Sequence, residues 1–193
     1  MTDDARSSVP PAPFPGTTDE WRVYLTEYSD WFLNNATDNY LYDVSEQQIS
    51  SRWVGYEPAD EQLIAATEAR LGVPLPPSLR AFLLTSDGWG PVAGWTDALR
   101  SCADIEWFHE THASFVDAVE EDDDEELDNG VFRHSLSIAR GEDAFLLDTR
   151  EILPNGEYRA HHLAVKYGDL SDPCTSFSEL LTLGRTELED VIE

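Results

Sequence analysis

The sequence predicts an α+β fold in which a helical pair and a C-terminal helix pack on a mostly antiparallel sheet. Two amphipathic stretches joined by a Gly-Val-Pro break occupy residues 58–88. Short apolar runs separated by turn residues follow over residues 136–167, and a last helical pattern begins at Ser176. Helices followed by a run of strands and then by another helix are typical of the α+β class, because the helices segregate to one face of an antiparallel sheet.

The chain begins with two segments that precede this pattern. Residues 1–16 are rich in proline, serine and aspartate, a composition that predicts a disordered segment. Residues 17–34 predict a helix capped by Thr17 or Thr18, and its apolar face comprises Trp21, Leu25, Tyr28 and Phe32. Large exposed apolar faces are uncommon on monomers, so we expect this helix to dock on the rest of the chain, the alternative being a partner. A polar connector with a short helix near residues 44–49 follows.

The helical pair lies between Pro58 and Gly88. The first helix carries the apolar stripe Leu63, Ile64, Thr67 and Leu71. Gly72 suits a left-handed C-cap, and Pro74 prevents the helix from continuing. The second helix starts near Pro76, and its apolar face comprises Leu75, Leu79, Phe82 and Leu83.

The run LGVPLPPSLRAFLLTSDGW, residues 71–89, resembles the signature of the SUKH superfamily, which includes fungal cell-wall-assembly regulators and many bacterial toxin-immunity proteins. The matching positions are Glu68, Leu71, Gly72, Leu75, Pro76, Leu79, Phe82, Leu83, Asp87 and Gly88. Residues 145–148 resemble the central strand of the family, and residues 176–181 resemble its final helix. The resemblance covers roughly residues 55–183 and implies a SUKH-like α+β domain.

Later turn and cap signals set the remaining boundaries. Residues 154–157, Pro-Asn-Gly-Glu, predict a hairpin turn because Asn-Gly tolerates positive φ at both central positions. Ser176 and Glu179 form a capping-box pattern, and Gly184 predicts the end of the last helix. We therefore divide the chain into a disordered segment 1–16, an aromatic helix and connector 17–54, a SUKH-like α+β domain 55–184 and an acidic tail 185–193.

The charge of the chain restricts its partners. The 39 acidic and 12 basic residues give a formal net charge of −27. Such a charge repels phosphate backbones and anionic lipids, so we expect no direct binding to nucleic acid or to a membrane surface. It favours fast association with a basic protein. No apolar run is long enough to span a membrane, and the first residues lack the pattern of a signal peptide, so a cytoplasmic location is expected.

The sequence offers little evidence of catalysis or metal binding. Glu106, His109 and His112 lie three residues apart, but this spacing spreads the side chains around a helix, and solvated histidines are the alternative. Cys102 and Cys174 fit no CxxC motif, and no GxSxG, HExxH or phosphate-loop pattern occurs. We expect no enzyme activity, no cofactor and no metal.

The resemblance and the charge together predict a non-enzymatic immunity protein that binds and blocks a cognate basic toxin, such as a nuclease. The candidate contact residues are an acidic run and three aromatic anchors: Glu120, Glu121, Asp122, Asp123, Asp124, Glu125, Glu126, Trp89, Trp95 and Trp107. The alternatives are a solubilising loop for the acidic run and core packing for the tryptophans.

Two other functional classes stay open. The resemblance to cell-wall regulators implies a regulatory protein-interaction scaffold, in which residues 1–16 and the aromatic helix would bind partners. A small-molecule-binding module would need a cavity in the sheet that a sequence does not reveal.

Overall fold

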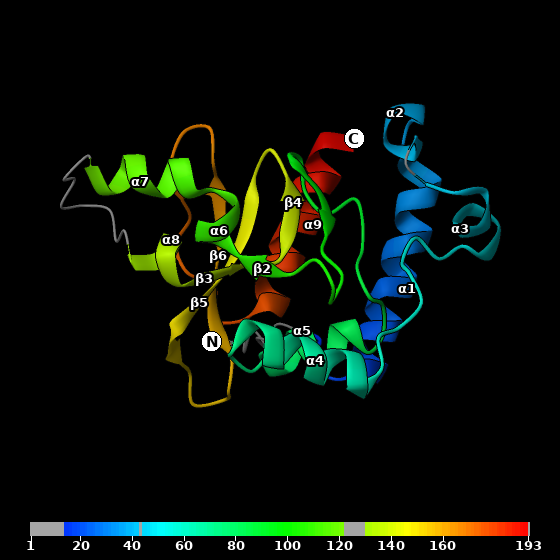
Figure 1. Ribbon diagram of the computed structural model, residues 1–193. Coiled ribbons are helices and arrows are strands. Elements are labelled where there is room, and N and C mark those ends of the chain that lie inside the picture. The colour runs from blue at the N-terminus through cyan, green and yellow to red at the C-terminus, as the bar shows by residue number, and fades with distance from the viewer. Residues whose placement is uncertain (1–13, 43, 122–129, 193) are drawn as a thin grey trace, which may run out of the picture.

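The computed structural model describes residues 14–42, 44–121 and 130–192. Its helices are α1 Thr18–Asn35, α2 Asp38–Leu41, α3 Glu46–Ser51, α4 Glu61–Leu71, α5 Pro77–Leu83, α6 Phe108–Thr111, α7 Ala113–Glu121, α8 Gly130–His134 and α9 Phe177–Ile192 (Figure 1). Its strands are β1 Thr96–Leu99, β2 Glu106–Trp107, β3 Ser135–Ser137, β4 Ala139–Gly141, β5 Ala144–Ile152, β6 Tyr158–Ala164 and β7 Asp169–Leu170. The architecture is α+β, as the sequence predicts.

Every strand pair in the described residues is antiparallel. A five-stranded sheet has the order β2-β3-β5-β6-β7, and β1 pairs with β4 in a separate two-stranded sheet. The predicted turn at residues 154–157 joins β5 to β6, with Gly156 at a positive φ of 84°. β6 follows this turn and ends at Ala164, three residues before the end of the predicted strand-rich stretch 136–167.

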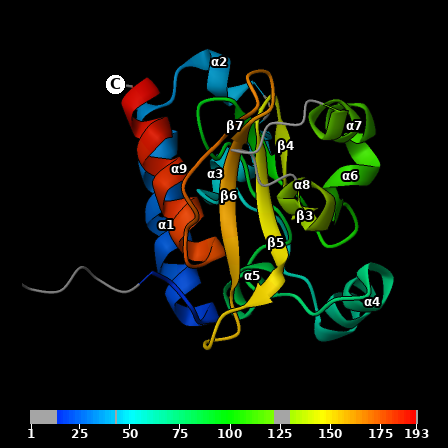
Figure 2. The same cartoon turned by 90° about the vertical axis from the view of Figure 1, so that its left-hand side faces the viewer.

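The central strand β5 is buried on both faces. Phe145 and Leu147 belong to a large core shared with α1, α4, α5 and α9, whereas Leu146 belongs to a smaller core with α6, α7 and α8. Figure 2 shows α1 and α9 on one side of the sheet and α6 to α8 on the other. Because successive side chains of a strand point to opposite faces, a strand covered on both sides reads as a continuous apolar run.

The aromatic helix α1 docks on the rest of the chain, as expected. Its residues Trp21, Leu25, Tyr28 and Phe32 are fully buried. The Trp21 indole N–H donates a hydrogen bond of 2.9 Å to the Ser78 carbonyl, and the Tyr28 hydroxyl donates one of 2.9 Å to the Pro91 carbonyl. Thr17 caps the helix in a capping box with Glu20.

The helical pair is α4 and α5. Asp60 caps α4, so the helix begins at Glu61 and Pro58 lies before it. Gly72 takes the expected left-handed conformation, with a φ of 75°. The N-terminus of α5 follows Pro76, which has no side-chain cap; the hairpin residue Glu157 instead accepts hydrogen bonds from the Ser78 backbone N–H (2.8 Å) and hydroxyl (2.7 Å).

The last helix does not end at Gly184, as the sequence suggested, but continues to Ile192. Gly184 is buried, and a Cβ built on it would lie 2.9 Å from Phe145 Cζ. The glycine therefore provides a close approach to the sheet rather than a cap. Leu188 is fully buried, and this burial favours continuation of the helix through the predicted acidic tail.

The start of α9 confirms half of the expected capping box. The Ser176 hydroxyl accepts the Glu179 backbone N–H at 3.1 Å. The Glu179 carboxylate does not return to Ser176 but accepts hydrogen bonds from the backbone N–H and hydroxyl of Thr175.

Candidate protein-interaction surface

The acidic run begins at the C-terminal end of α7. Glu120 forms a bidentate ion pair with Arg133 of α8, with oxygen–nitrogen distances of 2.6 and 2.7 Å, and this hydrogen bonding lowers the pKa of Glu120. Glu121 is exposed and closes the helix. The remaining candidates of the run, Asp122, Asp123, Asp124, Glu125 and Glu126, lie outside the described residues. One of the two described carboxylates is thus already engaged by a cation of the chain.

The three candidate tryptophans differ in exposure. Trp89 is fully buried, and its ring packs edge-on against Tyr28 and Trp53 at centroid distances of 5.6 and 5.2 Å. It offers no surface to a partner in this conformation, so the core-packing alternative describes it. Trp107 in β2 is half-buried, with its ring 6.0 Å from that of His109. Trp95 is 66% exposed.

Trp95 lies at the tip of the β1–β4 sheet. Its carbonyl accepts the backbone N–H of Asp143 at 3.1 Å. Gly141 makes this close pairing feasible, because a Cβ at that position would lie 2.4 Å from the Trp95 carbonyl oxygen and its φ is +152°. These contacts fix the backbone of Trp95, while its side chain is exposed to solvent.

A polar link connects this tip to α9. His162 of β6 lies between two carboxylates, with Nδ1 3.8 Å from Glu187 and Nε2 3.0 Å from Asp143. Glu187 and then Asp143 raise the pKa of His162, although partial burial opposes them. The link is therefore electrostatic and joins β6 to α9.

A small pocket of about 200 Å³ opens beside this link, between α9 and the chain that follows β6. Its lining combines the apolar residues Phe145, Leu180 and Leu183 with His162 and with the carboxylates of Asp172 and Glu187. Asp172 is exposed, and the Glu187 side chain is 51% exposed.

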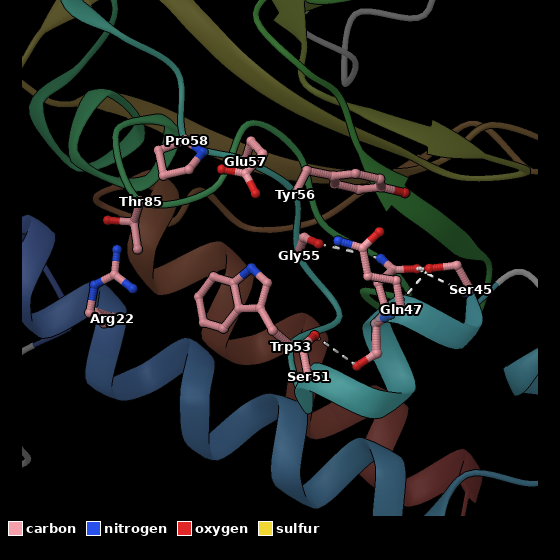
Figure 3. Close-up of a pocket in the computed structure, with 11 residues that line it drawn as sticks. Arg22, Ser45, Gln47, Ser51, Trp53, Gly55, Tyr56, Glu57, Pro58 and Thr85 are labelled. Atoms are coloured by element: carbon pink, nitrogen blue, oxygen red, sulfur yellow. Dashed lines mark hydrogen bonds between the residues drawn. The ribbon is translucent and has the colours of Figure 1, made fainter.

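A larger groove runs between α1, α3 and residues 53–58 (Figure 3). The Arg22 guanidinium lies 5.9 Å from the Trp53 ring centroid, and the Gln48 amide donates to the Val54 carbonyl at 2.8 Å. The groove is also lined by Ser45, Tyr56 and Glu57.

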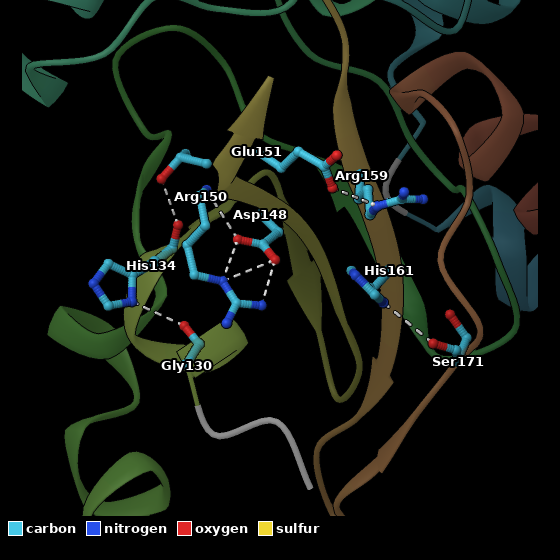
Figure 4. Close-up of polar contacts among 9 residues, drawn as sticks. Gly130, His134, Asp148, Arg150, Glu151, Arg159, His161 and Ser171 are labelled. Carbon is cyan, nitrogen blue, oxygen red and sulfur yellow. Dashed lines mark hydrogen bonds and ion pairs between the residues drawn. The ribbon is translucent and has the colours of Figure 1, made fainter. Parts of the chain in front are cut away.

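The polar contacts along β5 and β6 hold parts of the chain together (Figure 4). Arg150 forms a two-pronged contact with Asp148, including a distance of 2.6 Å, and Arg159 pairs with Glu151 at 3.1 Å. His161 Nδ1 lies 3.2 Å from the Ser171 carbonyl, which holds the chain after β7 against β6. These contacts neutralise arginines within the sheet.

The described residues offer little reactive chemistry. Burial, and then the nearby Asp87, raises the pKa of Cys102 to about 12, and burial raises that of Cys174 to about 11, so both are thiols near neutral pH. In the part of the chain that the structure describes, no group of three acidic, histidine or cysteine side chains could hold a metal ion. No helix there is long and apolar enough to cross a membrane.

The model of the SMI1 / KNR4 family (SUKH-1) matches residues 58–183, which is more than half of the chain. The chain belongs to this family. No individual curated protein matches it.

Membership in SUKH-1 narrows the functional classes. The SUKH family covers immunity proteins and Smi1-like regulators, its members often bind toxins, and they are generally non-catalytic. The SUKH-1 match starts just before α4 and ends within α9. Helix α1 and the last two turns of α9 therefore lie outside the part of the chain that the family model describes.

The sequence did not indicate the cluster around His162. Asp143, His162 and Glu187 come from a turn, a strand and a helix that are distant in sequence. Leu183, Glu187 and Val191 do recur at helical spacing, and this spacing indicates that the helix continues past Gly184. The prediction that the helix ends at Gly184 left this spacing out of account.

Proposed function

We propose that this SUKH-1 chain is a non-enzymatic immunity protein that binds a cognate basic toxin and blocks it. The observation that carries this proposal is the distribution of charge. The described arginines that contact carboxylates of the same chain are Arg52, Arg80, Arg100, Arg133, Arg150, Arg159 and Arg185. These arginines already contact carboxylates of the chain itself, and the whole chain has a formal net charge of −27, which favours a basic partner.

Such a surface suits a partner whose own site is basic. Enzymes that cleave nucleic acids hold phosphates with lysine and arginine, so an acidic protein seated over such a site competes with the substrate electrostatically and excludes it sterically. The blockade requires no bond-making group, in agreement with the raised thiol pKa values of Cys102 and Cys174.

The regulatory-scaffold alternative loses one of its supports. In that reading the aromatic helix would bind partners, but Trp21, Leu25, Tyr28 and Phe32 are fully buried in the core of the chain itself. A scaffold would need a different surface.

The test first sequences the genes next to that of this chain and then uses a toxin domain that they encode. Co-expression in a bacterial host should restore growth, and a catalytically inactivated toxin domain should bind the purified chain. Binding should weaken steeply as NaCl is raised above about 0.1 M, because the distance over which exposed charges interact is about 10 Å at this concentration and shortens as salt is added. Absence of both protection and binding would exclude the proposal.

A further inference from the structure

Exposed apolar side chains gather where the β1–β4 tip meets the last turns of α9. Trp95 is 66% exposed, Leu183 50% and Val191 56%. A Cβ built on Gly94 would lie 3.6 Å from Val191 Cγ2, so the residue next to Trp95 contacts the helix. We refer to Trp95, Leu183 and Val191 as the Trp95 face.

The three side chains lie close enough for one interface. Leu183 and Val191 are eight residues apart on α9, and at 1.5 Å per residue they are separated by about 12 Å along the axis. Glu187 is four residues from each of them, so the three side chains lie on the same side of the helix. A standard interface of roughly 800 Å² per partner easily spans this distance.

Exposed carboxylates lie beside this apolar face, as does the exposed Arg140 of β4. Glu142, Glu187, Asp190 and Asp172 are all exposed. The arginine of the same helix, Arg185, is directed away from it: its guanidinium lies over the rings of Tyr24 and Tyr28 of α1, and its Nε contacts Glu189. An apolar centre with an acidic rim is complementary to a partner surface that presents aliphatic groups ending in positive charges.

The pocket beside Leu183 has the same two-part character. The buried Phe145 and Leu180 give it an apolar floor, the exposed carboxylates of Asp172 and Glu187 form its rim, and His162 lines it beside Glu187. The methylene stem of a lysine or arginine can pack on such a floor while its charged end meets the rim. Its volume of about 200 Å³ admits one side chain rather than a small-molecule ligand of drug size.

From these observations we infer that the Trp95 face is the surface that binds the basic toxin, and that the pocket beside Leu183 receives a lysine or arginine side chain of that toxin. This inference rests on the proposed function and names the surface that performs it. Trp95 acts as the aromatic anchor, since the energy of an interface concentrates in such residues.

The rival surfaces fit this role less well. At the end of α7 the apolar residue Val116 is buried and Glu120 is bidentately paired with Arg133, whereas the contact of Glu187 with His162 is longer, at 3.8 Å. The groove in Figure 3 contains Arg22, a cation that would repel a basic partner.

The experiment measures the affinity of variants for the inactivated toxin domain identified in the test of the proposed function. Trp95→Ala should weaken binding about 30-fold, the effect of losing an anchor residue. Leu183→Arg and Leu183→Glu form a matched pair at one exposed site: both remove the apolar contact, but the arginine also repels the basic partner. We expect Leu183→Arg to bind at least 10-fold more weakly than Leu183→Glu. Circular dichroism should show that all three variants fold.

Ile152→Ala is the control, because Ile152 is 61% exposed at the far end of β5 and should leave the affinity unchanged. If the wild-type chain binds the toxin domain but Trp95→Ala and Leu183→Arg bind within threefold of it, the inference is refuted and the proposed function survives. A loss of binding in Glu121→Lys alone would place the interface at α7 and refute it as well. If the wild-type chain does not bind, the proposed function itself fails.

Discussion

Replacing Gly184 by alanine tests how closely α9 packs on the sheet. In an exposed helix this substitution stabilises, because alanine is favoured over glycine by about 1 kcal/mol. Here the added methyl group would lie 2.9 Å from Phe145 Cζ and 3.2 Å from the Val92 carbonyl oxygen. Both are shorter than the optimal carbon contact of about 3.5–4.0 Å. The two effects therefore oppose each other.

The packing cost is expected to exceed the gain in helix propensity. Phe145 is fully buried, and the second contact is with backbone, so neither neighbour can move aside freely. Overpacking of this kind costs roughly 1–3 kcal/mol. After subtraction of the helix-propensity term, Gly184→Ala should lower the free energy of unfolding by about 1 kcal/mol, which corresponds to a fall in Tm of roughly 3 °C for a chain of this size.

Urea denaturation followed by circular dichroism measures this difference. Thr186→Ala, at an exposed position of the same helix, should be neutral or slightly stabilising and serves as the control. In the background of Phe145→Leu, which removes the Cζ atom, Gly184→Ala should cost less than it does in the wild type. Equal or higher stability of Gly184→Ala in the wild-type background would refute the close approach of α9 to β5.

Three further predictions concern stability. Trp21→Ala should lower the free energy of unfolding by about 3–5 kcal/mol in urea titrations, because it empties a fully buried site and leaves the Ser78 carbonyl without its donor; an effect below 1 kcal/mol would contradict the docking of α1. Glu157→Ala should cost about 1–3 kcal/mol by orphaning two Ser78 donors, whereas Glu157→Gln keeps an acceptor and should cost less; equal losses would exclude the capping role. The pKa of His162 is raised in the fold, so its contribution is complete below about pH 6.5 and is lost as pH rises through the folded value. His162→Gln should therefore flatten this decline in Tm toward pH 8, and an unchanged profile would refute the link to Glu187 and Asp143.

Several local features were predictable because they depend on neighbouring residues alone. Thr17 caps α1, Gly72 ends α4 and Gly156 turns the β5–β6 hairpin, each through backbone conformations or hydrogen bonds within a few residues. The apolar run at residues 144–147 likewise indicated a buried strand.

The candidate site was predicted less completely. The sequence alone does not distinguish the three candidate tryptophans. In the structure Trp95 is exposed, Trp89 is fully buried and Trp107 is half-buried. Exposure depends on which elements cover a residue, and only the tertiary arrangement decides that. The same applies to Glu157, whose partner Ser78 lies 79 residues away.

By itself, the sequence determined the α+β class, the family signature of the helical pair and the surplus of negative charge, since these are properties of composition and short-range pattern. The tertiary structure decided which charged side chains are paired with one another within the chain. It paired arginines with nearby carboxylates, buried the aromatic face of α1, and extended α9 past Gly184 so that Val191 lies beside Gly94, the residue next to Trp95. The physical reason is that burial and ion pairing depend on distances between elements, and these are set only when the whole chain has packed.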